Sequence, residues 1–343
     1  EAQAIRNGVG LIDATAFTKH RVRGSGATKF LDWFTCNSLP KIGKINLTYA
    51  LTSAGTIHSE YTIVRLAENE YYLISAGAWA DYDSDFLRKS AKIKVNEFGN
   101  IEIQNETTHW GVFAIAGPNS RKFLNRLVRS SKEVSTLSNK EFPWLSHKEI
   151  EIGMCPVNAI RVAYTGELGW ELHHPLEMQN YLFDTLLATG NDFDLKLVGS
   201  RAQNWLRQEK SYRAFGTELG RDATPLEAGL ERFIDFSKDF VGKSALKASK
   251  IKSKCVTLVI DGPNDTDPWG REAIYLKGQK IGRLTSGGYS VHMKKSIGMG
   301  YIDPKFNKIG QKFEVKILNK LWPAKLLQNS PYDPKNEKIR SDQ

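Results

Sequence analysis

The chain has 343 residues, of which 41% are hydrophobic and 25% charged, and its net charge is +10. These values are typical of a globular protein of two or three domains. No apolar run approaches the ~20 residues that span a bilayer. The excess lysines are scattered, without a zinc-finger, helix-turn-helix or RNA-binding pattern. We therefore predict no membrane segment and no nucleic-acid partner.

The three cysteines, Cys36, Cys155 and Cys255, lie far apart in the sequence. Their spacing suits neither a disulfide framework nor a zinc site and favours a reducing compartment. His173 and His174 are neighbours on a predicted strand, so they point to opposite faces and cannot chelate one ion together. We predict no metal site.

Strands dominate the first 76 residues. Residues 9–23 are predicted to form a strand, and a helix follows the Gly24-Ser25-Gly26 turn. This turn lacks the third glycine of a dinucleotide-binding loop, so we interpret it as structural. Three further strands are predicted at 45–52, 57–66 and 71–75.

The middle strand of these three carries a carboxylate on a mostly apolar face. Its two-residue period places His58, Glu60 and Thr62 on one face, and Ser59 and Tyr61 on the other. A surface sheet with polar tips explains this pattern. A catalytic acid or base with a raised pKa explains it equally well.

A second carboxylate follows a glycine-rich turn at residues 164–173. Two glycines three residues apart predict a tight turn between two strands. In the second strand, Glu171 and His173 share one face, and Trp170 and Leu172 take the other. A carboxylate among large aromatic side chains needs N–H donors. The residues alone leave open a core hairpin with an ion pair or a binding site.

The rest of the chain is predicted to change from mixed to all-β structure. Residues 143–155 are interpreted as a polar connection, and helices are predicted at 177–189 and about 200–213. Turns recur every 8–12 residues beyond position 250, which is typical of an all-β barrel or sandwich. Strands are predicted there at 255–260, 273–276, 281–286, 298–302, 313–317 and 322–327. We predict two domains, residues 1–250 and 251–343.

Five separated stretches together resemble one enzyme family. They are Ser53-Ala54-Gly55-Thr56-Ile57-His58-Ser59-Glu60, Tyr164 through His173, Leu206-Arg207-Gln208-Glu209-Lys210, Thr224-Pro225-Leu226-Glu227-Ala228-Gly229 and Leu284-Thr285-Ser286-Gly287-Gly288. In this order they resemble the aminomethyltransferase (glycine-cleavage T-protein) family of tetrahydrofolate enzymes. Within it, the chain is most similar to the folate half of dimethylglycine and sarcosine dehydrogenases.

The resemblance implies an α+β fold of three lobes, in which two α/β lobes surround a central channel beside a C-terminal β-barrel. It implies that tetrahydrofolate enters this channel and traps the carbon of an N-methyl amine, or of its iminium, as 5,10-methylene-tetrahydrofolate. Oxidation of the amine requires FAD on an upstream domain or a partner subunit. The first residue is not a methionine, so we expect a fragment or a processed product. Bacterial cytoplasm or the mitochondrial matrix is the implied location.

Two alternatives stay open at this level. One is a methyltransferase (demethylase) that moves a methyl group to tetrahydrofolate without a flavin partner. The other is a folate-binding scaffold without catalysis.

The resemblance also implies roles for individual residues. Glu171 matches the glutamate that holds the pterin ring, since a carboxylate can accept two parallel N–H bonds. Tyr164 matches the tyrosine that packs against the folate, and Leu172 and His173 flank the same contact. Arg207 matches an arginine that orients a carboxylate or the pterin carbonyl.

Glu60 is the implied catalytic residue. It stands where the family has an aspartate that positions or deprotonates a folate nitrogen, and its side chain is one methylene longer. Tyr61 and Thr62 continue this strand beside the ring and are implied cofactor contacts.

Two positions depart from the family pattern. Many relatives have a tyrosine thirteen residues before the acid, where this chain has Leu47; Tyr49 comes two residues later. Arg232 replaces an aromatic residue that is usual in the dehydrogenase subgroup. An arginine can stack on a pterin face, or it marks a changed substrate.

Overall fold

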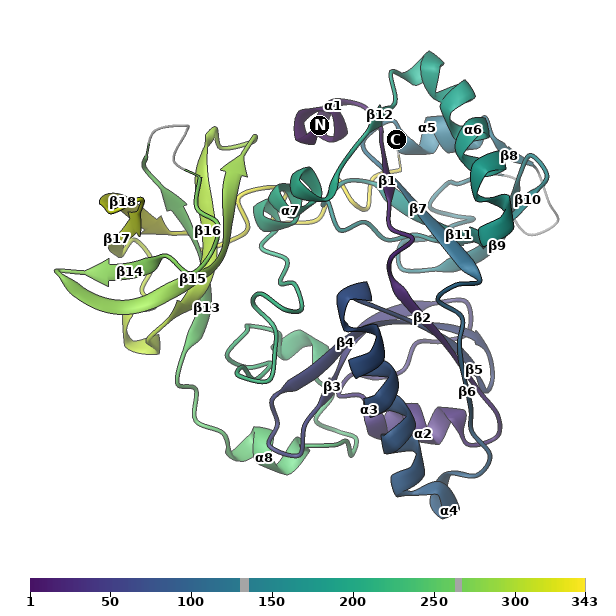
Figure 1. Cartoon of the computed structure of the whole chain (residues 1–343), viewed down its shortest axis with the longest axis horizontal. Helices are drawn as coiled ribbons and strands as arrows, with labels where there is room; N and C mark the ends of the chain where they lie inside the picture. The colour runs from purple at the N-terminus through teal and green to yellow at the C-terminus, as the bar shows by residue number, and fades with distance from the viewer. Residues whose placement is uncertain (130–135, 263–266, 343) are drawn as a thin grey trace.

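The chain folds into three lobes, as shown in a computed structural model that describes residues 1–129, 136–262 and 267–342. Two lobes are built on separate sheets and the third is a closed barrel. In Figure 1 the barrel lies on the left and the two sheet lobes lie on the right, one above the other. The predicted α+β class with a C-terminal barrel is confirmed.

The upper lobe contains a seven-stranded sheet in the order β12-β1-β7-β11-β10-β9-β8. The strands are β1 Gly10–Asp13, β7 Trp110–Ala116, β8 Val128–Arg129, β9 His147–Ile152, β10 Cys155–Ile160, β11 Gly169–Pro175 and β12 Lys196–Leu197. Helices α5 (Ser120–Asn125) and α6 (Gln179–Gly190) belong to this lobe. Its core includes Trp170 and Leu172, which the two-residue period placed together on one face of β11.

The lower lobe contains a five-stranded sheet in the order β3-β4-β5-β2-β6. The strands are β2 Thr18–Arg23, β3 Ile45–Leu51, β4 Ile57–Ala67, β5 Glu70–Ser75 and β6 Glu102–Asn105. Its helices are α2 (Ala27–Phe34), α3 (Ala80–Ile93) and α4 (Val95–Phe98). Gly55 turns β3 into β4 with φ +79°, and a Cβ there would lie 2.8 Å from the Leu246 backbone, so the turn requires glycine.

The third lobe is a barrel closed in the order β13-β16-β15-β14-β17-β18. Its strands are β13 Lys254–Ile260, β14 Ala273–Leu276, β15 Gln279–Ser290, β16 Lys295–Ile302, β17 Lys312–Ile317 and β18 Lys320–Leu326. Each corresponds to one of the six strands predicted beyond residue 250. The domain boundary itself stays a prediction.

The remaining helices connect the lobes. Helix α7 (Ser200–Glu209) lies between the barrel and the upper sheet (Figure 1). The short helix α1 (Ala2–Asn7) lies beside α7. The short helix α8 (Lys243–Ala248) lies beside the β3–β4 turn. Single 3₁₀ turns occur at Gly77–Trp79, Leu176–Met178, Asn191–Phe193, Glu231–Phe233 and Pro304–Phe306.

Three local predictions were wrong. Residues 9–23 form two strands, β1 and β2, which belong to different sheets. Residues 143–155 include β9, an amphipathic strand in which Ile150 and Ile152 are buried between exposed Glu149 and Glu151. The connection from β10 to β11 is an eight-residue loop rather than a tight turn, although the two strands do pair, with Ile160 opposite Glu171.

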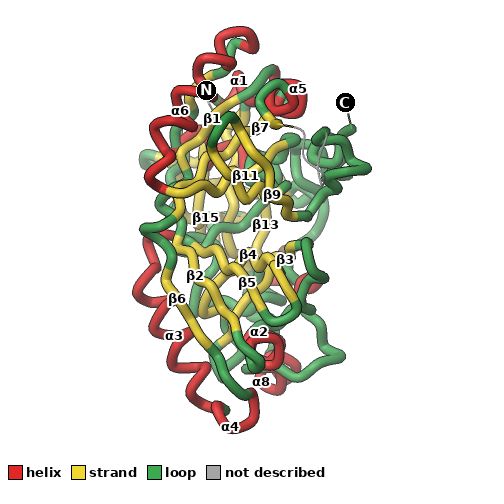
Figure 2. Tube along the Cα trace, turned by 90° about the vertical axis from the view of Figure 1, so that its right-hand side faces the viewer, coloured by secondary structure: helices red, strands yellow, loops and turns green. Residues whose placement is uncertain are grey.

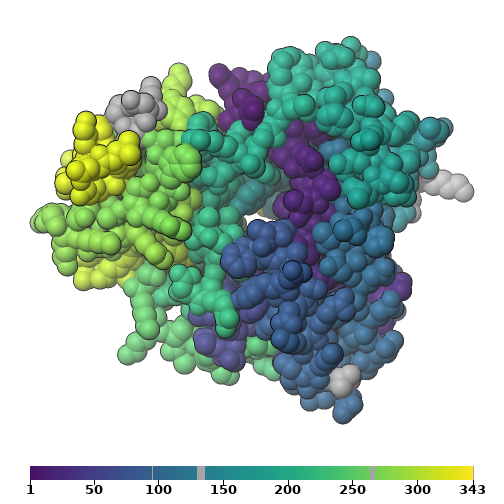
Figure 3. All heavy atoms as spheres, viewed as in Figure 1, coloured from purple at the N-terminus to yellow at the C-terminus, as the bar shows by residue number. Residues whose placement is uncertain are grey.

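The facing surfaces of the two sheets meet in a small apolar cluster. Figure 2 shows the sheets one above the other. Val64, Tyr72 and Ile74 of the lower sheet contribute to this cluster, together with Ile160 of the upper sheet. Because Glu60 and Val64 lie on the same face of β4, Glu60 also faces the junction between the lobes. The space-filling view is hollowed where the three lobes meet (Figure 3).

Candidate active site

Glu60 lies on β4 and is partly buried. Burial raises the pKa of its carboxyl to about 7, while a hydrogen bond from Tyr49 and the charge of Arg207 act in the opposite direction. A carboxyl with a pKa near neutrality can both accept and donate a proton at physiological pH. The environment of Glu60 is therefore suited to acid–base chemistry.

Tyr49 is the direct cross-strand neighbour of Glu60 in the β3–β4 pair. Its side chain is 1% exposed, and burial raises the pKa of its hydroxyl well above the usual value. Tyr49 therefore stays protonated and acts as a donor to the Glu60 carboxylate. Leu47, which stands at the position of the family tyrosine, lies opposite Thr62 instead.

Arg207 forms a buried ion pair beside this acid. Its Nη1 lies 2.6 Å from Glu218 Oε2, and both side chains are about 1% exposed or less. Glu218 also accepts hydrogen bonds from Thr285 Oγ1 (2.7 Å) and Ser286 Oγ (2.5 Å) of the barrel. The charge of Arg207 and these hydroxyl donors hold the pKa of Glu218 below its usual value despite burial. This network fixes α7 to the barrel.

One nitrogen of Arg207 is left without a protein partner. Its Nε donates to Asn204 Oδ1 at 2.9 Å and its Nη1 to Glu218 and to the Tyr212 carbonyl, whereas Nη2 is buried and makes no hydrogen bond within the described chain. A buried guanidinium N–H without an acceptor is costly. A carbonyl or carboxylate oxygen of a ligand would satisfy it.

Glu171 borders a recess formed by the upper sheet, the loop that precedes β11, and α7. The recess is small, with a cavity volume of about 10 Å³, and it is lined mainly by apolar groups, among them Ile12, Phe17, Val162 and the Tyr164 ring. The Glu171 side chain is 13% exposed. The lining, apolar with one carboxylate, matches the chemistry of a flat heterocycle that carries N–H donors on one edge.

His173 lies behind Glu171 rather than in the recess. Its Nε2 is 3.3 Å from Glu171 Oε2, its Nδ1 is 3.2 Å from Tyr72 Oη, and the side chain is 0% exposed. His173 is therefore placed to act on a ligand through Glu171. Its neighbour His174 points to the other face and stacks on Phe113 at 4.9 Å.

Tyr164 lies in the wall of the recess. Its ring lines the recess and stacks on Tyr212 with centroids 6.0 Å apart, and its hydroxyl donates to the Arg213 carbonyl at 3.1 Å. Burial raises the pKa of Tyr164, and the nearby charges of Arg207 and Glu60 also act on it. Tyr164 therefore lines the same recess as Glu171 and lies within reach of the charge of Glu60.

Other predicted contacts lie elsewhere. Tyr61 is fully buried on the opposite face of β4, against Phe34 of α2, and Leu172 is fully buried in the core of the upper lobe. Thr62 is partly exposed on the Glu60 face. Arg232 is exposed, and its guanidinium lies 4.6 Å from the Phe233 ring centroid.

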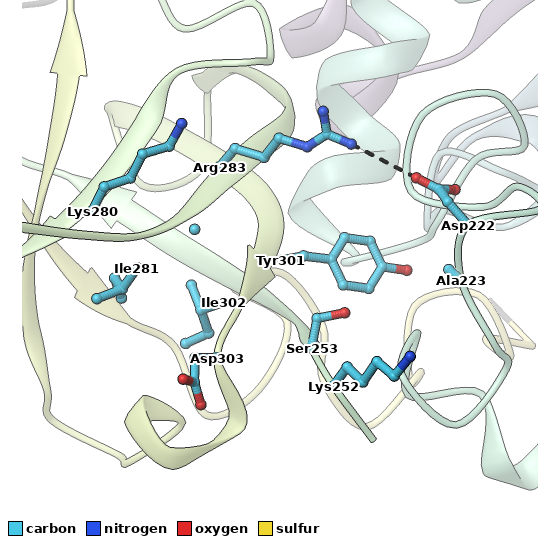
Figure 4. A pocket seen from close by; sticks show the side chains of 11 residues that line it. Asp222, Ala223, Lys252, Ser253, Lys280, Ile281, Arg283, Tyr301, Ile302 and Asp303 are labelled. Carbon is cyan, nitrogen blue, oxygen red and sulfur yellow. Dashed lines mark ion pairs between the residues drawn. The ribbon is translucent and has the colours of Figure 1, made fainter. Parts of the chain in front are cut away.

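A larger groove, with a volume of about 430 Å³, opens beside the barrel (Figure 4). Arg283 and Asp222 approach each other across it at 3.7 Å, and Tyr301 extends into it from β16. None of the predicted site residues lines this groove. One residue of its lining does contact the ion pair of Arg207 and Glu218: Tyr301 Oη donates to the Glu218 backbone carbonyl at 2.8 Å.

Sequence reasoning missed four residues of this arrangement: Tyr49, Tyr72, Tyr212 and Glu218. The register of the β3–β4 hairpin could have identified Tyr49, because it follows from the short turn between the strands. Glu218 lies in an irregular segment, and its partners come from α7 and the barrel. No local pattern signals such a contact.

Comparison with known proteins identifies the family and the fold. The model of the GCVT N-terminal domain matches residues 1–238, and that of the glycine cleavage T-protein C-terminal barrel domain matches residues 254–333. The chain belongs to the glycine cleavage T-protein family. Its fold matches the crystal structure of glycine cleavage system aminomethyltransferase T from Bartonella henselae with a TM-score of 0.84, at 21% identity over 97% of this chain and 89% of that chain.

Two kinds of relative share this family. An aminomethyltransferase from Caldanaerobacter subterraneus is 32% identical over 97% of this chain and 87% of its own length. The mitochondrial dimethylglycine dehydrogenase of Rattus norvegicus is 37% identical over 96% of this chain but only 38% of its own length. The chain therefore spans less than two fifths of this dehydrogenase. Within the described residues, no helix has the length and apolar character that crossing a membrane requires.

Proposed function

We propose that this chain binds tetrahydrofolate at the junction of its two sheet lobes and captures a one-carbon unit on it. The observation that carries the proposal is the pair of carboxylates in different settings. Glu60 has a pKa of about 7 beside Arg207, whereas Glu171 borders an apolar recess. Two carboxylates in different surroundings often take different roles in one site, one in acid–base chemistry and the other in binding.

The recess suits the pterin ring of tetrahydrofolate. Glu171 would accept the ring N–H bonds, and the Tyr164 ring would cover part of its apolar surface. The unpaired Nη2 of Arg207 would donate to a ligand oxygen. These side chains bind and orient the ligand, and the apolar lining excludes water from it.

Glu60 manages the proton. Each of the two folate nitrogens loses one proton when it bonds to the carbon of the iminium. Glu60 accepts the proton of the nitrogen that attacks first and returns it to the amine that departs, and the proton of the second nitrogen is released to solvent. The pKa of about 7 makes both transfers feasible at one pH. Tetrahydrofolate supplies the two nitrogens between which the carbon is held as 5,10-methylene-tetrahydrofolate.

The donor is an N-methyl amine of the dimethylglycine or sarcosine type. This part of the proposal is supported by the 37% identity to a dimethylglycine dehydrogenase, of which the chain spans 38%. A flavin domain or subunit carrying FAD would oxidise the amine to its iminium. The folate site would then trap the carbon.

The test uses the full-length gene product and dimethylglycine labelled with ¹³C in its methyl groups. With tetrahydrofolate and an electron acceptor present, the proposal predicts that the label appears in 5,10-methylene-tetrahydrofolate. If tetrahydrofolate does not change the fate of the label, the proposal is wrong. Label transfer from a methyl sulfonium to tetrahydrofolate, without any transfer from dimethylglycine, would favour the flavin-independent methyltransferase.

A further inference from the structure

A hydrogen-bonded chain of three side chains crosses from one sheet to the other. Glu171 on β11 lies 3.3 Å from His173 Nε2, and His173 Nδ1 lies 3.2 Å from the hydroxyl of Tyr72 on β5. The His173 and Tyr72 rings are nearly perpendicular, with centroids 5.5 Å apart. His173 is 0% exposed and Tyr72 is 4% exposed. Neither ring is positioned to contact a ligand extensively.

The direction of these bonds follows from the chemistry of the groups. Burial lowers the pKa of His173, although Glu171 opposes this effect, so the imidazole is neutral at pH 7. A neutral imidazole has one N–H donor and one acceptor nitrogen. The Glu171 carboxylate only accepts, so Nε2 carries the proton and Nδ1 accepts from the Tyr72 hydroxyl. Tyr72 remains protonated because burial raises the pKa of its hydroxyl.

Tyr72 belongs to the sheet that carries Glu60. It lies opposite Val64 of β4, and Val64 shares the face of Glu60 by the two-residue period. One end of this hydrogen-bonded series, Tyr72, therefore belongs to the sheet that carries Glu60. The other end is the Glu171 carboxylate at the recess. The distance between Glu60 and Glu171 depends on how the two sheets are held together.

We propose that His173 is a positioning residue, joined to Tyr72, that holds the Glu171 carboxylate in the orientation required by a ligand with two parallel N–H donors. The inference rests on the proposed function in assigning tetrahydrofolate as this ligand. His173 fixes one lone pair of Glu171 Oε2, which restricts rotation of the carboxylate before a ligand arrives. Through Tyr72, it also fixes Glu171 relative to the sheet of Glu60.

Calorimetric titration with tetrahydrofolate tests the link to Glu171. His173→Leu removes the donor, and the expected loss of affinity is roughly tenfold to a hundredfold. His173→Gln places an amide N–H near the same position, and its affinity should recover to within about threefold of the original. Unchanged affinity in His173→Leu, or an equal loss in both variants, would overturn the proposal, because an equal loss indicates packing alone.

Tyr72→Phe tests the hydrogen bond between Tyr72 and His173. It also replaces His173→Leu as the test if that variant does not fold. It removes one hydroxyl while retaining the ring, and the expected loss of affinity is roughly threefold to tenfold. In ¹⁵N NMR spectra, His173 of the original protein should be a single Nε2–H tautomer. Tyr72→Phe should leave this tautomer in place, because Glu171 still accepts from Nε2–H, whereas Glu171→Ala should populate the Nδ1–H form as well. An unchanged affinity in Tyr72→Phe would refute the role of Tyr72.

Failure of this inference can be told apart from failure of the proposed function. If Glu171→Ala does not weaken tetrahydrofolate binding, the assignment of the recess is wrong. If Glu171→Ala weakens binding but His173→Leu does not, the recess binds folate and only the positioning role of His173 is wrong.

Discussion

Tyr49 and Glu60 lie directly opposite each other in the β3–β4 pair, and the tyrosine hydroxyl donates to the glutamate. The family resemblance implies a tyrosine at position 47, where this chain has a leucine that lies opposite Thr62. A phenol two residues along the strand thus contacts the acid. The departure at Leu47 does not leave Glu60 without a tyrosine partner.

Tyr49→Phe is predicted to shift the pH dependence of one-carbon transfer. Glu60 accepts a proton, so activity should rise with pH through about 7. Loss of the Tyr49 hydroxyl removes a hydrogen bond that lowers the pKa of Glu60. The pH at which the rate rises should therefore increase by roughly one pH unit. Rate measurements from pH 5 to 9 check this. Tyr71→Phe, which alters a buried tyrosine bonded to Thr28, is the control and should leave this pH unchanged.

Glu60→Gln is predicted to separate binding from chemistry. Glutamine retains the shape and polar character of the side chain but cannot carry the proton. One-carbon transfer should fall by roughly 10²-fold or more, while the affinity for tetrahydrofolate changes little. Single-turnover rates and calorimetry measure the two effects. A variant that transfers the carbon at the original rate would remove Glu60 from the mechanism.

The same substitution should stabilise the protein at neutral pH. The pKa of Glu60 is about 7 in the folded chain, against an ordinary value of 4.5. As pH rises between these values, the unfolded chain ionises first and the folded protein loses stability. Glu60→Gln should therefore raise the free energy of unfolding by about 1–3 kcal/mol above pH 7 and by nothing below pH ~4.5. A gain that is constant with pH would point to packing instead.

The ion pair between Arg207 and Glu218 is predicted to contribute strongly to stability. Glu218→Gln leaves a buried guanidinium without its counter-charge, and the expected cost is about 3–5 kcal/mol. Asp222→Asn is the matched control, because its pair with Arg283 is exposed at both ends and spans 3.7 Å. Its expected cost is below about 1 kcal/mol. Chemical denaturation measures both variants, and similar losses would contradict the account.

Local sequence patterns correctly predicted which side chains share a face of the strands that carry the candidate site. The two-residue period placed Glu171 and His173 together on β11 and assigned Glu60 and Tyr61 to opposite faces of β4, and the structure confirms both. It also shows why Tyr61 is poorly placed as a ligand contact, since its ring packs under α2. There the periodicity was a better guide to the side chain than the family resemblance.

Contacts between distant segments could not be predicted in this way. Tyr72 and His173 are 101 residues apart, and each follows an ordinary strand pattern. Glu218 obtains its partners from α7 and from the barrel, so its role depends on how three lobes assemble. Strand β9 was missed because its exposed positions are charged, which made an amphipathic strand resemble a polar connection.

The most direct test of the account is tetrahydrofolate binding to Glu171→Ala, measured by calorimetry. Glu151→Ala, which removes a mostly exposed glutamate of the same sheet, is the control. Loss of two charge-assisted hydrogen bonds should weaken binding by about a hundredfold or more in Glu171→Ala, with no change in the control. Affinity in Glu171→Ala equal to that of the original protein would contradict the placement of the pterin in this recess.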